Sequence, residues 1–159
     1  MKFVSEDIID EVVESINDEE DSLEAFVTSL QERQPVLFGY IFSENLEILH
    51  QEERELVLFL LLTIFLASEK VNGIFETVEV EIFEDAEEKN WELLGAGTSA
   101  QSFRERLDVF FEKTSQEDLL AFVEDALSDS EDGLTTKEGR EVVFVFLKSV
   151  IDCLEAVGK

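Results

Sequence analysis

The sequence predicts an all-α protein, a single compact bundle of about seven or eight helices over residues 1–159. Apolar residues recur at spacings of three and four along most of the chain, which is the period of an amphipathic helix. Helix-breaking residues are few, with one proline and seven glycines, so helices with short connections are favoured. The length fits one domain that can bury its own core without disulfides.

The chain is strongly acidic and yet rich in apolar residues. It carries 39 acidic residues against 12 basic ones, a formal charge of -27, while 45% of its residues are hydrophobic and 14 are phenylalanine. Acidic chains that are poor in apolar residues usually stay disordered, because they cannot bury enough surface to offset the entropy of the ordered chain. The apolar content here instead predicts a folded domain with a strongly negative surface.

The net charge of -27 limits the classes of partner that the chain is expected to bind. Phosphate binding requires clustered lysine and arginine, so nucleic acid is not expected as a ligand, and an anionic membrane surface would repel the chain. The charge favours a partner protein with a basic surface, a cation, or solubility alone. Because the N-terminus is acidic and Cys153 is the single cysteine, we expect a cytoplasmic protein without a signal peptide or an intrachain disulfide.

The apolar spacing places helices at definite positions. They are expected at residues 6–17, 22–33, 35–50, 52–70, 74–94, 98–113, 115–127 and 135–157. Pro35 suits a first helical turn, Gly73 a helix end, and Thr98 and Thr135 each begin a capping box. The apolar run at residues 56–67 is shorter than the roughly 20 residues of a membrane span, so it predicts the central helix of the core. Residues 142–150 predict a second buried helix.

Residues 74–94 are the ambiguous part of this pattern. Apolar and acidic residues alternate over residues 78–82, as in a half-exposed β-strand. Phe75, Val78 and Ile82 also fit one face of a helix, and the residues that follow favour helix. Because a lone strand would have no partner strand elsewhere in the chain, we interpret the segment as a helix.

The two halves of the chain share a faint internal similarity. Each can be described as a helix, a short turn, a second helix and then a long apolar helix. The similar segments are residues 21–27 with 117–123, 54–57 with 140–143, and 9–13 with 107–111. A duplication with pseudo-symmetric packing is one interpretation. The other is that amphipathic helices resemble one another by composition alone.

Glu47 and His50 have the Glu-x-x-His spacing, which on a helix places both side chains on one face. Di-iron bundles require two such motifs, and His50 is the only histidine, so a site of that type is excluded. His50 is expected at the end of the helix over residues 35–50, where the helix dipole favours a partly charged imidazole. That terminal role is the simpler interpretation, and a metal-binding bundle using both residues is the alternative.

Other motifs are too incomplete to predict chemistry. Residues 95–100 match the loose G-x-G-x-x-A pattern, but a helix end followed by a helix start explains them without a nucleotide. Residues 128–133 resemble the front of a calcium loop, but Gly139 stands where a bidentate glutamate is required. Cys153 has apolar neighbours, where a thiol usually serves packing. No cofactor and no catalytic residue is therefore expected.

An acidic segment with one aromatic residue is the candidate partner surface. Trp91 is the only tryptophan and lies among charged residues, where aromatic side chains often mark interfaces, although burial in the core is the simpler interpretation. The acidic side chains before it would attract a surface rich in lysine and arginine. The candidate partner-binding residues are Glu84, Asp85, Glu87, Glu88 and Trp91.

Three functions are compatible with these features. The leading one is a non-enzymatic, soluble protein that binds a partner with a basic surface, as inhibitors, immunity proteins and masking proteins do. The alternatives are the metal-binding bundle and a structural subunit of a homo-oligomer. Binding through exposed charge predicts capture that weakens as salt rises, which neither alternative predicts.

Overall fold

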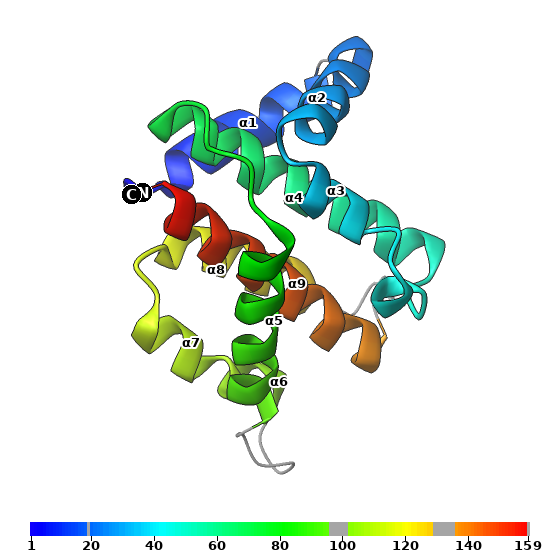
Figure 1. The fold of residues 1–159 in the computed structure, drawn as a ribbon, viewed down its shortest axis with the longest axis vertical. Helices are drawn as coiled ribbons and strands as arrows, with labels where there is room; N and C mark the ends of the chain where they lie inside the picture. The colour runs from blue at the N-terminus through cyan, green and yellow to red at the C-terminus, as the bar shows by residue number, and fades with distance from the viewer. Residues whose placement is uncertain (19, 96–101, 129–135, 159) are drawn as a thin grey trace.

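The computed structural model describes residues 1–18, 20–95, 102–128 and 136–158, and within them the chain is all-α without a β-strand. The predicted fold class is confirmed. Figure 1 shows α9 (Lys137–Val157) crossing the middle of the molecule, with the start of the chain beside the end of α9 at one edge. Helix α4 (Gln51–Asn72) packs on α9, and the other helices surround this pair.

The remaining helices are shorter. They are α1 Glu6–Asp18, α2 Glu20–Arg33, α3 Pro35–Tyr40, α5 Val80–Gly95, α6 Phe103–Arg106, α7 Asp108–Lys113 and α8 Glu117–Ser128, with a 3-10 turn, η1, at Glu44–Leu46. The predictions for α1, α2, α4, α8 and α9 are confirmed, with ends that differ by no more than two residues.

The two central helices are buried along most of their length. Residues 60–65 of α4 and 143–151 of α9 are uninterrupted buried runs, so both predicted core helices are confirmed. Helices that are apolar on every side require neighbours on every side, and these two receive them from each other and from α1, α5 and α8. In the described part of the chain, no helix combines the length and apolarity of a membrane span.

The helices pack as two similar groups. The first group begins with α1, which packs on α4, and the second begins with α5, which packs on α9. The long helices of the two groups then pack on each other. This packing supports the predicted correspondence of residues 54–57 with 140–143. It does not support the correspondence of residues 9–13 with 107–111, because it matches α1 with α5 rather than with α7.

A buried glutamine holds the segment that leads into α5. Gln34 Nε2 donates to the carbonyl oxygen of Glu76 at 2.9 Å, and Gln34 Oε1 accepts from the Val78 N–H at 2.8 Å. The side chain therefore pairs with two backbone groups on the same edge of an extended segment. Gln34 itself lies directly before α3 and is fully buried.

Gln116 makes the same pair of contacts with the segment that leads into α1. Its Nε2 donates to the Lys2 carbonyl oxygen at 3.1 Å, and its Oε1 accepts from the Val4 N–H at 3.0 Å. Gln116 is 1% exposed and directly precedes α8. Each glutamine thus belongs to one group of helices and holds the first segment of the other group. These reciprocal hydrogen bonds between a glutamine side chain and the backbone tie the two groups together.

Glu53 joins the starts of the two central helices. It is fully buried; its Oε1 accepts from the His50 N–H at 2.9 Å and its Oε2 from the Thr136 N–H at 2.9 Å. His50 and Thr136 directly precede α4 and α9, so one carboxylate serves backbone donors at two helix starts, where the dipoles favour negative charge. Thr136, one residue after the predicted Thr135, caps α9 by accepting from the Gly139 N–H.

The predicted helix at residues 35–50 is wrong beyond Tyr40, where α3 ends. A continuous helix that buries Ile41 would also bury Ile48, seven residues later, and would leave Leu46 on the outside. The structure does the reverse, because Leu46 is buried and Ile48 is 54% exposed. Because the helix ends at Tyr40, Ile41 and Leu46 can both lie in the core while Ile48 lies at the surface.

The predicted helix at residues 74–94 begins only at Val80. Residues 74–79 are neither helix nor strand, so the strand alternative is also wrong. Val78 is fully buried, which explains the apolar spacing before the helix. The segment is not helical because Gln34 occupies backbone groups that a helix would pair internally.

The predicted helix at residues 98–113 is divided into α6 and α7, which meet at Leu107. Leu107 keeps a right-handed helical backbone, so the division is a short irregularity in one helical path. The capping residue of α6 is Ser102, whose hydroxyl accepts from the Glu105 N–H at 3.2 Å. The capping box predicted at residues 98–101 lies outside the described residues.

Candidate partner-binding surface

The predicted partner-binding residues all lie on α5, but they do not form one surface. Glu84, Asp85 and Glu88 are exposed, and Trp91 is 39% exposed. Their spacing places these four side chains on the outer side of the helix. Trp91 therefore lies at the surface, and the simpler interpretation of a core tryptophan is wrong. Glu87 differs from the other four because it contacts another helix.

Glu87 is bound within the fold. The Tyr40 hydroxyl lies 2.6 Å from Glu87 Oε2 and 2.7 Å from Oε1, to which it donates. The Tyr40 ring packs 4.4 Å from the Phe83 ring and is stacked at 5.7 Å on Phe146 of α9. This cluster fastens α3 and α5 to α9. Glu87 is thus explained by the internal packing of the bundle, and the outer face of α5 consists of the remaining acids and Trp91.

Glu47 and His50 do not share a helical face. Glu47 lies in the turn after η1, and His50 is the capping position before α4, so the expected place of His50 at a helix C-terminus is wrong. The Glu47 carbonyl oxygen accepts from Arg54 Nη2 at 3.3 Å, which fixes the turn. Among the described residues, no three or more His, Cys, Asp and Glu side chains are grouped so as to hold a metal ion.

Cys153 and the nucleotide-like and calcium-like patterns provide no reactive group among the described residues. Cys153 is fully buried in α9, and this burial, with a smaller effect of Asp152, raises the pKa of the thiol to about 12. A thiol with that pKa is protonated and unreactive at neutral pH. Residues 96–100 and 129–133, which hold most of the nucleotide-like and calcium-like patterns, lie outside the described residues.

A groove between α1 and α8 has the clearest chemical character of the cavities in the described structure. It has a volume of about 280 Å³, an apolar floor and an acidic rim. The floor is formed by Ile9, Ala121 and Phe122, and the rim by Glu6, Asp10, Asp118 and Asp125. No lysine or arginine is among the described residues that line it.

Helical spacing brings the rim carboxylates together. Glu6 and Asp10 are four residues apart on α1, and Asp118 and Asp125 are seven apart on α8, so each pair lies on one face of its helix. Asp118 Oδ2 accepts from the Glu6 N–H at 2.9 Å, which fixes the start of α1 against α8. None of the four carboxylates forms an ion pair with another described residue.

The sequence does not predict this groove, because its two sides come from segments about a hundred residues apart that only the fold brings together. One signal was available in α8. Asp118 and Asp125 flank Phe122 on the same face, so acidic and apolar side chains are mixed there instead of lying on opposite faces.

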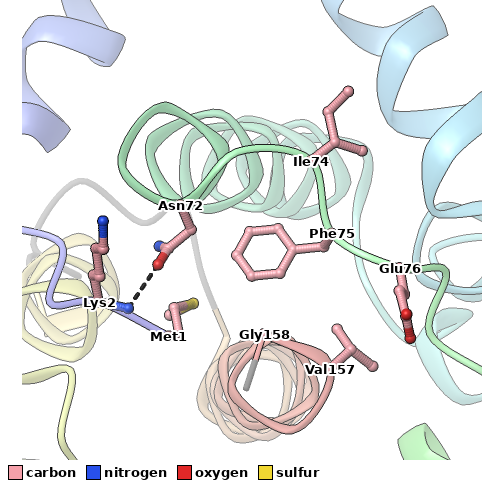
Figure 2. Close-up of a pocket in the computed structure, with 8 residues that line it drawn as sticks. All are labelled: Met1, Lys2, Asn72, Ile74, Phe75, Glu76, Val157 and Gly158. Carbon is pink, nitrogen blue, oxygen red and sulfur yellow. Dashed lines mark hydrogen bonds between the residues drawn. The ribbon is translucent and has the colours of Figure 1, made fainter.

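A second cavity, of about 570 Å³, lies where residues 1–2 meet residues 157–158. Figure 2 shows the Phe75 ring between the ends of α4 and α9, with the Lys2 N–H donating to Asn72 Oδ1 at 2.6 Å. Ile74, which also lines the cavity, is 73% exposed. The lining mixes apolar, basic and acidic residues, so it favours no single ligand class.

Comparison of the chain with known protein families, curated proteins and solved structures finds no significant match. An all-α bundle hosts many unrelated functions, so the fold class assigns none by itself. The functional argument therefore rests on the chemistry of the surfaces and cavities described above.

Proposed function

We propose that this chain is a non-enzymatic cytoplasmic protein that binds, and thereby inhibits or masks, a partner protein with a basic surface. The α1–α8 groove carries the proposal. Its four rim carboxylates have no ion-pair partner among the described residues, and they surround an apolar floor. The net charge of -27 extends the same preference over the rest of the surface.

A lysine or arginine side chain of the partner would match both parts of this groove. Its methylene stem can lie on Ala121 and Phe122 while its charged end reaches Asp10 and Asp125. Arginine suits the site better, because its planar guanidinium can bond two carboxylate oxygens at once. Asp118 already accepts from the Glu6 N–H, so its role would be to hold the rim in place.

The surrounding charge would act mainly on the rate and selectivity of association. A strongly negative surface attracts a basic partner before contact, and this attraction is screened within about 8–10 Å near physiological ionic strength. Binding should therefore weaken steeply as salt rises. Self-association through apolar surface would not weaken in this way, which separates the proposal from a homo-oligomer subunit.

The test is affinity capture from lysate of the source organism, with washes at about 0.1 M and about 1 M salt. Three forms of the protein serve as bait: the wild type, the groove variant Asp10→Asn/Asp125→Asn, and the control variant Glu84→Gln/Glu88→Gln. Both variants remove two negative charges from exposed helical positions, so they differ in place and not in charge. Asp118 is left intact because it also supports the fold.

The proposal predicts a basic protein that the wild type and the control variant retain at low salt and release at high salt. The groove variant should retain it poorly. Equal retention by all three baits would show that the groove is not where the partner binds. Salt-independent retention, or no retained basic protein, would contradict the basic-partner function itself.

A further inference from the structure

Arg140 is exceptional among the arginines of this acidic chain. Three of the other four pair with a carboxylate, and Arg54 donates to the carbonyl oxygens of Glu47 and Leu49. Arg140 has no such acceptor among the described residues; its guanidinium carbon lies 4.3 Å from the centre of the Phe103 ring. With 39 acids to 12 bases in the chain, an arginine that none of the described carboxylates neutralises requires an explanation.

The Arg140 side chain lines a cavity of about 420 Å³ between the start of α6, the end of α8 and the start of α9. The described lining consists of Ser102, Phe103, Arg104, Ser128, Lys137 and Arg140. It holds three cationic side chains and no acidic one. Arg104 contacts Glu124 at 3.5 Å, so its charge is partly compensated, whereas the structure gives Lys137 no ion pair with a described residue.

Two polar side-chain atoms of this lining are buried and have no hydrogen-bond partner among the described residues. They are Arg140 Nε and Ser128 Oγ, which can donate one hydrogen bond each. Buried donors of this kind are rare in native proteins, because each loses its hydration without a replacement. The positive end of α9, a 21-residue helix, lies at the same place and favours a negative charge there.

We propose that this cavity binds a small phosphate compound, with the phosphate group on Arg140, Lys137 and the Ser128 hydroxyl. With the Arg140 and Ser128 side chains turned toward the cavity, a phosphate oxyanion supplies acceptors for both donors, and the guanidinium can bond it through two parallel N–H groups. The cavity is larger than a bare phosphate ion, and Phe103 offers an apolar wall for an organic substituent. The distant acidic surface opposes this binding only weakly, since charges beyond about 8–10 Å are screened at physiological salt.

The test is titration of the ¹⁵N-labelled full chain with inorganic phosphate and separately with phenyl phosphate, followed by amide chemical shifts. Wild type, Arg140→Gln and the control Lys113→Gln are compared; Lys113 is exposed at the end of α7, and its substitution removes the same charge. We expect saturable shifts confined to the cavity-lining segments. Arg140→Gln should weaken binding at least about tenfold, and Lys113→Gln less than about twofold. Phenyl phosphate should bind more tightly than inorganic phosphate.

Shifts that do not saturate, that spread over the whole chain, or that weaken equally in both variants would overturn the proposal. If Arg140→Gln fails to fold, Lys137→Gln takes its place, because Lys137 is exposed and its loss leaves the packing unchanged. It should weaken phosphate binding severalfold, and binding equal to that of the wild type would contradict the assignment.

Discussion

Glu53 occupies the space that a side chain at residue 139 would need. A Cβ placed on Gly139 would lie 1.9 Å from Glu53 Oε2, far inside van der Waals contact. Glu53 and Gly139 are each the third residue of one of the two central helices, so they correspond in the paired arrangement. The glutamate caps both helix starts, and the glycine leaves the room for it to do so.

This relationship predicts strong coupling between the two positions. Glu53→Ala leaves two backbone donors without their acceptor and should lower the free energy of unfolding by about 2–4 kcal/mol. Gly139→Ala should destabilise the wild type, because its methyl group displaces the carboxylate. In the Glu53→Ala background its cost should fall by more than about 1 kcal/mol, measured by urea denaturation as a double-mutant cycle. Additive effects would show that the two residues do not compete for this space.

The two buried glutamines predict local effects on hydrogen exchange. Gln34→Ala removes the acceptor of the Val78 N–H, and Gln116→Ala removes that of the Val4 N–H. Each should speed exchange of its own amide by about ten- to a hundredfold, since a buried hydrogen bond to that amide is lost. Each variant is the control for the other. If both amides respond equally to both substitutions, the glutamines act only through global stability.

Burial of Glu69 predicts a pH dependence of stability. Desolvation raises its pKa and outweighs the opposing effect of Arg33. The folded chain therefore binds this proton more tightly than the unfolded chain, so stability falls as pH rises through the window above the ordinary carboxyl pKa. Between about pH 7 and about pH 5, the wild type should gain free energy of unfolding, and Glu69→Gln should gain less.

The control for this comparison is Glu88→Gln, which removes one negative charge from the exposed face of α5. Its gain on acidification should stay close to that of the wild type. Urea denaturation at several pH values in this range measures all three proteins. Equal gains for Glu69→Gln and the wild type would show that general charge repulsion, and not Glu69, governs the pH dependence.

Cys153 should be inert in the folded protein. Its buried thiol, with a pKa of about 12, presents almost no thiolate at about pH 8, and the reagent has no access to it. An Ala25→Cys variant places a second thiol on the exposed side of α2 as an internal standard. Mass spectrometry after alkylation should show one rapid modification without urea and two with it. Comparable rates for both thiols in the native protein would contradict this packing.

The two central helices, α4 and α9, are the most predictable part of this fold. The apolar runs in α4 and α9 leave few alternatives to complete burial, and the structure buries both. Where apolar residues are sparse, the pattern misleads. Leu23 belongs to the apolar stripe of α2, but it is 42% exposed because α2 lies at the edge of the bundle and is anchored mainly through Leu30.

Non-helical segments were harder to predict because distant side chains determine them. No sequence feature near residues 74–79 indicates that the side chain of Gln34, about forty residues earlier, forms hydrogen bonds with their backbone. The same limit applies to the candidate site. The acidic run on α5 is visible in the sequence, but the bond between Glu87 and Tyr40 depends on how α3 packs against α5. The α1–α8 groove requires the complete fold.

The central claim is that a basic partner docks at the α1–α8 groove, and carbodiimide cross-linking in lysate tests it most directly. The reagent joins carboxylates to lysine amines in direct contact, and mass spectrometry identifies the joined residues. The account predicts cross-links concentrated at Asp10 and Asp125, to lysines of one basic protein, and lost at about 1 M salt. Cross-links spread evenly over the acidic helices, with no preference for the groove, would contradict it.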